Sequence, residues 1–298
     1  MSMKVLVTGV CGQLGHDVVL ELKSRGHTPV GTDLAPRYPG DISYISLDLT
    51  DAAAVEKTLG EISPDAVVHC AAWTAVDAAE DAENIPKVRA VNASATEYIA
   101  KVCKALSCKL VYLSTDYVFS GTGETPWQPD SGDFAPQNIY GETKLAGEQA
   151  VRKLVDKHFI VRIAWVFGKN GNNFVKTMLN LSEKYDALRV VNDQIGTPTY
   201  TPDLSVLLCD MLETEKYGTY HATNEGGYIS WYDFACEIFR QAGKSVKVTP
   251  VTTEEYGLSK AARPKNSRLS KEKLTENGFR LLPPWQDALS RYLKEVQK

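Results

Sequence analysis

The sequence predicts an α/β protein built on a doubly wound parallel sheet, followed by a smaller, mixed α/β C-terminal domain. Three observations predict this class. Short β-branched runs alternate with longer helical patterns through the first 165 residues. The runs are apolar throughout, as strands are when helices cover both faces of a sheet. A glycine-rich turn joins the first strand to the first helix, where sheets of this class bind their ligands.

Six runs are expected to form the strands of this sheet. The helical segments 12–26 and 91–107 place apolar residues three and four apart, which is the pattern of a helix that lies on a sheet. A further helix is expected to begin at about Asn138. The expected strands are residues 4–9, 28–33, 42–48, 65–72, 108–115 and 159–165.

Beyond residue 165 the regular alternation ends, and we expect a smaller domain that lies over the ligand edge of the sheet. Residues 188–199 have the pattern of a strand that runs into a loop. Helices are predicted at 172–185, 230–243 and 285–298. In the second of these, Ser230 is suited to cap the first turn and Gly243 to stop the helix.

The composition is that of an ordinary globular protein, with 43% hydrophobic and 23% charged residues. A formal net charge of −4 argues against nucleic acid or an anionic membrane as the partner. Apolar runs are shorter than the roughly 18 residues of a membrane span, and the first ten residues pass directly into a strand pattern. We therefore expect neither a transmembrane helix nor a signal peptide. The six cysteines form no Cys-x-x-Cys pair, so buried thiols are expected and a metal site is not.

The first strand is followed by Gly9, Gly12 and Gly15 in a G-x-x-G-x-x-G spacing. Glycine there permits a tight turn and lets backbone N–H groups approach a pyrophosphate at the positive end of the helix. Glycines also punctuate ordinary strand–helix turns, but the βαβ context favours dinucleotide binding. We therefore assign 1–165, joined by part of 186–215, to a dinucleotide-binding domain, and 166–298 mostly to a substrate-binding domain.

Two aspartates end the next two strands. Asp33 lies at the distance where an acid holds the ribose hydroxyls of an adenosine, although it is equally suited to be a turn residue. A carboxylate there favours NADH, whereas Arg37 lies near enough to pair with the 2′-phosphate of NADPH, so both cofactors stay open. Asp48 falls where a contact with adenine is expected, or else it begins a turn and caps the next helix.

The fifth strand ends in LSTDYVF, residues 113–119, and the next helix carries Tyr140 and Lys144 one turn apart on one face. The ordinary pKa of tyrosine, about 10, is too high for efficient proton transfer at neutral pH. We expect the ammonium of Lys144 and an oxidised nicotinamide to lower the pKa of Tyr140. A Tyr–Lys pair at this spacing is common on helices, and it becomes informative together with the nucleotide turn.

The T-G-x-x-G-x-x-G turn, the hydroxyl residue at the end of the fifth strand and the Y-x-x-x-K pair together resemble the extended short-chain dehydrogenase/reductase superfamily. Over nearly the whole chain, the sequence resembles the dTDP-4-dehydrorhamnose reductase family. The segments that carry this resemblance are GQLG, HCAAWTAVDAAED, STDYVF, IYGETKLAGE, NNFVKTM, VNDQIGTPT and ARPKNSRL. The resemblance implies a Rossmann-like fold and reduction of the 4-keto group of dTDP-4-dehydro-L-rhamnose by NADPH or NADH, giving dTDP-L-rhamnose.

The resemblance also implies roles for individual residues. Thr115, Tyr140 and Lys144 take the catalytic roles, with Tyr140 as general acid. Trp165 would flank the sugar, although a tryptophan there can also be a core or lid residue. Trp73 departs from the smaller aromatic that is usual in the family. The expected cofactor-binding residues are Gly9, Gly12, Gln13, Leu14, Gly15, Asp33, Asp48, Leu49, Ala71, Ala72, Trp73, Tyr140 and Lys144, and the expected substrate-binding residues are Thr74, Val76, Thr115, Asp116, Trp165 and Arg263.

Several residues keep more than one interpretation. Arg263 is either a ligand of the substrate diphosphate or a surface arginine. Asp116 is either an orienting group or a turn residue, and Ser114 is expected to face the packing of the sheet. Residues 193–199 resemble a family loop near the nucleotide end of the substrate, and Asn92 receives no role.

Proteins with related folds and other activities provide the alternatives to a reductase. A 4,6-dehydratase needs an additional acid and base, and its strand ends in Thr-Asp-Glu, whereas Tyr117 stands at the third position here. A 4-epimerase uses a similar triad, but the short chain and the reductase-like segments speak against it. A non-catalytic relative, like the regulatory subunit of methionine adenosyltransferase, would keep the fold without the reaction.

The expected setting is the cytoplasm. The partners that we expect are a dTDP-linked 4-keto-6-deoxy sugar and the dinucleotide, with neither nucleic acid nor a membrane, and a homodimer is left open.

Overall fold

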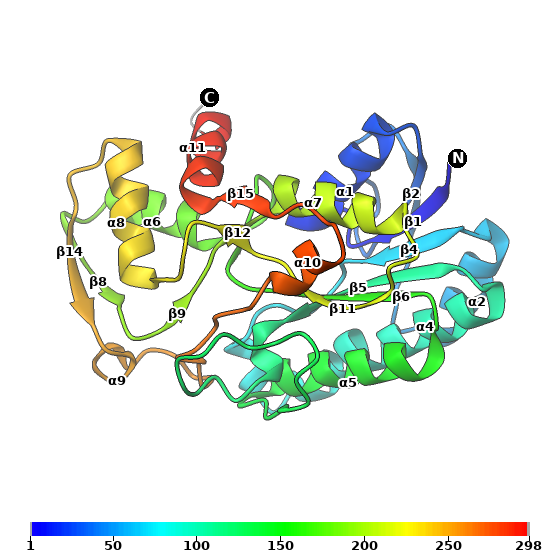
Figure 1. Cartoon of the computed structure of the whole chain (residues 1–298), viewed down its shortest axis with the longest axis horizontal. Coiled ribbons are helices and arrows are strands. Elements are labelled where there is room, and N and C mark those ends of the chain that lie inside the picture. Colours follow the sequence, from blue (N-terminus) through cyan, green and yellow to red (C-terminus); the bar gives the residue numbers. More distant parts are fainter. Residues whose placement is uncertain (1, 297–298) are drawn as a thin grey trace.

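The computed structural model describes residues 2–296, which are built around a seven-stranded sheet with all strands parallel (Figure 1). The predicted doubly wound architecture is confirmed, because the chain adds strands first on one side of β1 and then on the other. In spatial order the strands are β11 (Gly218–His221), β6 (His158–Ile163), β5 (Lys109–Thr115), β4 (Ala66–His69), β1 (Lys4–Thr8), β2 (Thr28–Asp33) and β3 (Ser43–Ser46).

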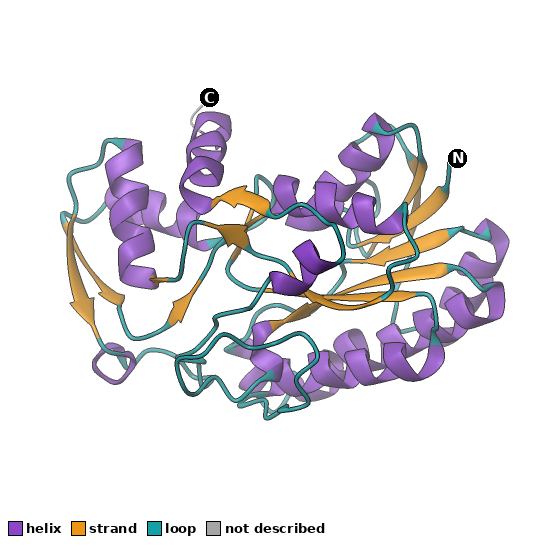
Figure 2. Cartoon of the chain, viewed as in Figure 1, coloured by secondary structure: helices purple, strands orange, loops and turns teal. Residues whose placement is uncertain are grey.

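Helices cover both faces of this sheet (Figure 2). Side chains alternate along each strand, so Val5 and Val7 enter one core and Leu6 enters the other. This explains why the strands are apolar throughout their length. The helices are α1 (Gln13–Ser24) and α7 (Thr201–Leu212) on one face, and α2 (Ala52–Ile62), α4 (Ala95–Leu106) and α5 (Ile139–Leu154) on the other.

The predicted strands agree with the observed ones to within three residues at each end. The largest local departure with a clear cause is the sixth strand, which ends at Ile163 instead of Trp165. Trp165 has a φ of 51°, in the left-handed region, and this conformation cannot continue a strand. Helix α5 begins directly after Asn138, where the sequence predicted its start, and Asn138 caps it because its Oδ1 accepts the N–H of Gly141 at 2.8 Å.

The second half of the chain also contributes to the large sheet. Helix α7 lies within the stretch 186–215 and packs against α1. Strand β11 lies beyond that stretch and pairs with β6, an addition that the sequence pattern did not predict. Strand β8 (Ala187–Val191), from the same stretch, instead pairs with β14 (Lys247–Val251) in the smaller domain.

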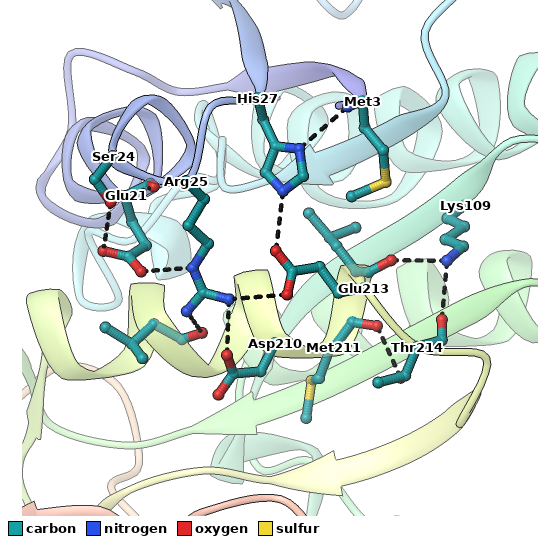
Figure 3. A network of polar contacts seen from close by, with 12 residues as sticks. Met3, Glu21, Ser24, Arg25, His27, Lys109, Asp210, Met211, Glu213 and Thr214 are labelled. Atoms are coloured by element: carbon teal, nitrogen blue, oxygen red, sulfur yellow. Dashed lines mark hydrogen bonds and ion pairs between the residues drawn. The ribbon is translucent and has the colours of Figure 1, made fainter. Parts of the chain in front are cut away.

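A polar network joins α7 to the end of α1 (Figure 3). Arg25 donates from Nη1 to Asp210 Oδ1 at 2.7 Å and from Nη2 to the carbonyl of Val206 at 3.1 Å. His27 Nε2 lies 3.1 Å from Glu213 Oε1, while His27 Nδ1 accepts the backbone N–H of Met3. These contacts hold a helix from the second half of the chain on the first βαβ unit.

The smaller domain has its own core, in which Phe167, Phe234 and Tyr292 pack together. The predicted cap and stop of its second helix are confirmed: Ser230 Oγ accepts the N–H of Asp233, and Gly243 has a φ of 67°. Residues 297–298 of the third predicted helix lie outside the described residues. The helices are α6 (Phe174–Ser182), α8 (Trp231–Ala242) and α11 (Trp285–Val296).

Shorter elements lie between these strands and helices in both parts of the chain. They include a π-helical turn, Ala90–Ser94, directly before α4. The others are β7 (Val166–Phe167), β9 (Ile195–Gly196), β10 (Thr199–Tyr200), β12 (Asn224–Glu225), β13 (Ile229–Ser230), β15 (Leu282–Pro284), α3 (Ile85–Arg89), α9 (Thr253–Tyr256) and α10 (Glu272–Glu276).

Within residues 2–296, no helix combines the length and the apolar character needed to cross a membrane. All six cysteines are free thiols. In the same part of the chain, no three His, Cys, Asp or Glu side chains gather as ligands for a metal ion.

A fully buried ion pair ties α5 to the edge of the sheet. Glu148 on α5 and Arg162 on β6 are both 0% exposed. Arg162 donates from Nε and Nη2 to the two oxygens of Glu148, both at 2.8 Å. The remaining donor, Nη1, reaches the carbonyl of Pro129 and Nε2 of His221 on β11. Such a bidentate pair is directional, so it orients the helix as well as holding it.

Replacing Glu148 with Ala is expected to lower the free energy of unfolding by about 3–5 kcal/mol, because it leaves the guanidinium of Arg162 buried without a counter-charge. Urea unfolding followed by circular dichroism measures this change. Glu142→Ala is the matched control on the same helix, since the Glu142–Arg89 pair is exposed on both sides and is worth about 0–1 kcal/mol. Equal losses in the two variants would contradict the prediction.

Candidate functional site

A cavity of ≈ 1060 Å³ lies at the carboxyl ends of β1, β4 and β5, with residues of the smaller domain in its wall. The structure brings most of the predicted site residues together in this wall. Gly15 and Trp73 lie outside it. The predicted residues that line the cavity are Gly9, Gly12, Gln13, Leu14, Asp33, Asp48, Leu49, Ala71, Ala72, Thr74, Val76, Thr115, Asp116, Tyr140, Lys144, Trp165 and Arg263.

The glycine-rich turn is packed as tightly as its spacing suggested. Gly9 has a φ of 69°, and a Cβ there would lie 2.8 Å from the backbone nitrogen of Ala71. A Cβ at Gly15 would lie 2.3 Å from the carbonyl oxygen of Gly9, so Gly15 lets α1 pack on the turn and does not face the cavity. Helix α1 starts after Gly12 without a side-chain cap, which leaves the N–H groups of its first turn for an anion.

The two strand-ending aspartates both line the cavity, and both are partly engaged by backbone. Asp33 accepts the N–H of Cys11 at 3.0 Å and that of Leu34 at 2.7 Å, which ties the glycine turn to β2. Asp48 accepts the N–H and the hydroxyl of Thr50, and these bonds lower its pKa. Asp48 does not cap the next helix. Asp51 does so, through the N–H of Ala54 at 3.0 Å.

Helix α5 lies unusually close to β5, and two glycines permit this. A Cβ at Gly141 would lie 2.3 Å from the carbonyl oxygen of Tyr117, and one at Gly147 would lie 2.3 Å from the hydroxyl of Tyr112. The Tyr112 hydroxyl in turn donates to the carbonyl of Lys144 at 3.1 Å. This approach places Tyr140 and Lys144 in the same cavity wall as Thr115.

Asp116 is 2% exposed and holds the hydroxyl of its neighbour. Thr115 Oγ1 donates to Asp116 Oδ1 at 3.0 Å, and Ser267 Oγ donates to the other oxygen. Burial raises the pKa of Asp116 to about 6, although both hydroxyls stabilise its charge. Between the two interpretations left open by the sequence, this geometry favours an orienting group over a turn residue.

Desolvation is the largest cause of the pKa shifts of both Tyr140 and Lys144. It raises the pKa of Tyr140 well above its ordinary range, and the neighbouring Thr115 hydroxyl opposes that rise. It lowers the pKa of Lys144 to about 7, against the carboxylate of Glu148. The pKa of Tyr140 is therefore raised, opposite to the lowering expected from the sequence, because burial and the charges of Asp116 and Tyr117 all act in the same direction.

Asn92 connects the loop after β4 to α5, a role that the sequence did not suggest. It is 1% exposed and lies in the π-helical turn. Its Oδ1 accepts the N–H of Trp73 at 2.8 Å, and its Nδ2 donates to the carbonyl of Trp73 and to Thr143 Oγ1. The indole of Trp73 is not part of the cavity wall and donates to the carbonyl of Ala75, which is a lining residue.

At the substrate side, the structure sharpens two further predictions. Arg263 is no free surface arginine. It donates to the hydroxyl of Tyr117 at 3.1 Å and pairs with Asp77. Ser114 lines the cavity, contrary to the expected sheet packing. It is 3% exposed, and its hydroxyl has no partner among residues 2–296.

These features fit a dinucleotide. The uncapped first turn of α1 offers N–H donors for a pyrophosphate. The buried hydroxyl of Ser114 has no hydrogen-bond partner among residues 2–296. The cavity volume lies at the upper end of the usual range of small-ligand sites, about 300–1,000 Å³, as a large ligand such as a dinucleotide requires. The carboxylates of Asp33 and Asp48 both line the cavity, while Arg37 lies outside the lining.

The doubly wound sheet, the glycine-rich turn and the Tyr140–Lys144 pair at its carboxyl edge define a dinucleotide-dependent oxidoreductase of the short-chain dehydrogenase/reductase class. More narrowly, the chain belongs to the family described as the RmlD substrate binding domain, whose model matches residues 3–298. The family resemblance seen in the sequence is thereby confirmed.

Relatives and solved structures agree with this assignment. A dTDP-4-dehydrorhamnose reductase of Shigella flexneri is 38% identical over 99% of this chain and 98% of its own length. A dTDP-4-keto-6-deoxy-D-glucose reductase of Streptomyces niveus is 36% identical over 98% of this chain and 96% of its own. The crystal structure of dTDP-4-dehydrorhamnose reductase from Bacillus anthracis in complex with NADP has a TM-score of 0.91 and 41% identity, and covers 99% of this chain and 100% of its own.

Several lining residues were not identified from the sequence. Trp231 and Phe174 stand at the first position of their helices, where an aromatic residue has the same local pattern as one that packs in a core. Ser114 was assigned to the wrong environment, since strand alternation does not say where a cavity begins. Ser230, as a capping residue before Trp231, indicated where the helix begins. It did not indicate that Trp231 would line the cavity.

The depressed pKa of Lys144 predicts a pH-dependent cost in stability. Unfolded lysine binds a proton below about pH 10.5, whereas the buried amine does so below about 7, so the native state loses stability as pH falls through that window. Lys144→Met removes this cost. We expect its stability relative to wild type to rise by roughly 2–3 kcal/mol from pH 9.5 to pH 7.5.

Urea unfolding of the cofactor-free protein at the two pH values measures the difference. Lys104→Met, on the exposed face of α4, is the control, and its difference from wild type should not change with pH. A pH-independent difference for Lys144→Met would show that the amine is not desolvated.

Proposed function

We propose that this protein reduces the 4-keto group of dTDP-4-dehydro-L-rhamnose, using NADPH or NADH, to give dTDP-L-rhamnose. The observation that carries the proposal is the meeting of Thr115, Tyr140 and Lys144 in one cavity wall that continues to the glycine-rich turn. The relatives named above act on dTDP-linked 4-keto sugars, which supports this substrate class.

The dinucleotide would be held by the first turn of α1, by Asp33 at the ribose and by Lys144 near the nicotinamide. When bound, the reduced nicotinamide supplies the hydride for the carbonyl carbon. The loop 71–76 is held in place beneath it by Asn92, through the two backbone bonds to Trp73.

Tyr140 acts as the general acid. In the direction of ketone reduction the acid must carry its proton, and desolvation keeps the phenol of Tyr140 protonated at neutral pH. The alkoxide that develops on the sugar is more basic than the phenol, so the proton moves to it. Thr115 now donates its one hydroxyl proton to Asp116. When the ketone is bound, that proton would turn from Asp116 to the same oxygen and form a second hydrogen bond.

The remaining residues orient the sugar nucleotide. Trp165 lies beside the sugar, and Arg263 faces its diphosphate. Because Arg263 already pairs with Asp77, the diphosphate must share or displace that carboxylate. Thr74 and Val76, from the loop after β4, line the cavity near the reacting end.

The rival reactions are less well supported by this site. A dehydratase would need a base at Tyr117, whose pKa desolvation raises to about 12. An epimerase would return its cofactor unchanged, whereas a reductase consumes one NADPH for each product. A regulatory subunit would bind the dinucleotide without turnover. We place the reaction in the cytoplasm, where free thiols such as the six here stay reduced.

Tyr140→Phe is expected to lower kcat by about 10²–10⁴-fold while NADPH still binds, because the change removes the proton but keeps the ring. The assay follows NADPH and NADH oxidation with dTDP-4-dehydro-L-rhamnose, and fluorescence titration measures NADPH binding. Tyr185→Phe, at a side chain that is 54% exposed, is the control and should behave as wild type.

Three results would overturn the assignment. Wild-type protein that binds NADPH but never oxidises it with this sugar would be a non-catalytic relative. Product formed without consumption of NADPH would indicate an epimerase. Faster turnover of dTDP-4-keto-6-deoxy-D-glucose would assign a different substrate.

A further inference from the structure

Trp165 is held in a backbone conformation that it would not adopt alone. Its φ of 51° lies in the left-handed region, which is costly for a bulky side chain. Two bonds from Thr199 impose it: the N–H donates to the carbonyl of Trp165 at 3.1 Å, and Oγ1 donates to the carbonyl of Ala164 at 2.6 Å. The strain is therefore imposed by a segment more than 30 positions further along the chain.

The indole of Trp165 is confined as firmly as its backbone. The ring of Trp231 stacks on it, with centroids 3.7 Å apart and planes 17° from parallel. Gly196 also lies against it, because a Cβ at that position would stand 2.9 Å from Cε2 and 3.1 Å from Cζ2 of the indole. Neither contact leaves room for a second rotamer without displacement of a neighbour.

A single short ladder builds both contacts. Strands β9 and β13 pair antiparallel, with Ile229 opposite Gly196 and Ser230 opposite Ile195. Trp231 follows directly, as the first residue of α8, and the reciprocal bonds between Ser230 and Asp233 fix the start of that helix. The segment DQIGTPT, whose local pattern is only that of a turn-rich loop, thus places both Gly196 and Thr199 around Trp165.

We propose that Gly196 and Trp231 are positioning residues that hold the Trp165 indole at the angle at which it meets the substrate sugar, and that Trp231 extends this aromatic wall. The inference rests on the proposed function, which places a 6-deoxy sugar beside Trp165. Both tryptophans line the cavity that contains Thr115 and Tyr140.

The chemistry of the ligand explains why a rigid indole matters. A 6-deoxy sugar presents a methyl group and C–H bonds, which pack on a flat aromatic face and make no directional hydrogen bond to it. Its orientation then depends on the orientation of the wall. A wall that is fixed before binding spares the entropy of ordering it and keeps the ketone within reach of Thr115 and Tyr140.

Gly196→Ala tests this with the smallest change available, since its backbone conformation suits alanine and the added methyl would lie 2.9 Å from the indole. The methyl would also lie 3.0 Å from Ser267 Cβ, so the Trp231 variants, which leave Ser267 untouched, are needed to assign the effect to the indole. We expect kcat/KM for the ketosugar to fall on the order of tenfold to a hundredfold, because small misplacements at a reacting centre cost that much. Gly60→Ala, where nothing lies within 4 Å of the added methyl, is the matched control and should keep wild-type kinetics.

Trp231→Leu and Trp231→Phe form the second arm. Leu removes the stack and should lower kcat/KM as Gly196→Ala does, whereas Phe keeps an aromatic face and should restore most of it. In all three variants, NADPH should bind within about twofold of wild type, because no residue of the glycine turn changes. Near-UV circular dichroism should lose the signal of the stacked pair in Trp231→Leu.

The outcomes separate this inference from the function on which it rests. A wild-type protein without turnover would overturn the proposed function itself. An active wild type with unchanged kcat/KM in Gly196→Ala and Trp231→Leu would overturn the positioning role. That role would also be overturned if those variants lost NADPH affinity and thermal stability in parallel with activity, or if Trp231→Phe failed to restore activity.

Discussion

The close approach of α5 to β5 is the constraint on which the site depends. Gly141 and Gly147 each leave room for a group of the adjoining strand or turn, where a Cβ would lie 2.3 Å from an oxygen. This contact carries Tyr140 and Lys144 into the cavity wall, where the rings of Tyr117 and Tyr112 pack against them. The Asn138 cap fixes the start of the helix, and the buried Glu148–Arg162 pair fixes its middle.

The same burial that assembles these groups also decides their protonation. A Tyr–Lys pair in water would be a phenol beside an ammonium, with the phenol made more acidic. Here desolvation raises the pKa of Tyr140 and lowers that of Lys144 to about 7, so both groups favour their neutral forms. That state suits the proposed role of Tyr140, as an acid that must arrive protonated at a ketone. It also costs stability, as perturbed groups in active sites commonly do.

The site belongs to both parts of the chain. The first βαβ units supply the glycine turn, the Asp33 carboxylate and the catalytic helix, while later segments supply Trp165's support, Ser267 and Arg263. Asp116 joins the two, since it accepts from Thr115 on β5 and from Ser267 near the C-terminal end. The substrate is therefore expected to meet a surface that exists only when the smaller domain is packed on the sheet.

The sequence by itself determined the features that arise from local patterns. Apolar runs, helical spacing and caps located the strands and helices, and the i,i+4 spacing put Tyr140 and Lys144 on one face. Only the tertiary structure decided the added strand β11, the cap at Asp51 in place of Asp48, and the position of Trp73 outside the cavity wall. Only the tertiary structure showed that the Ser114 hydroxyl has no partner among residues 2–296 and that Trp231 stacks on Trp165. It also determined that the pKa of Tyr140 is raised and not lowered. The physical reason is that these properties depend on contacts between distant segments and on burial, and neither quantity is contained in the spacing of neighbouring residues.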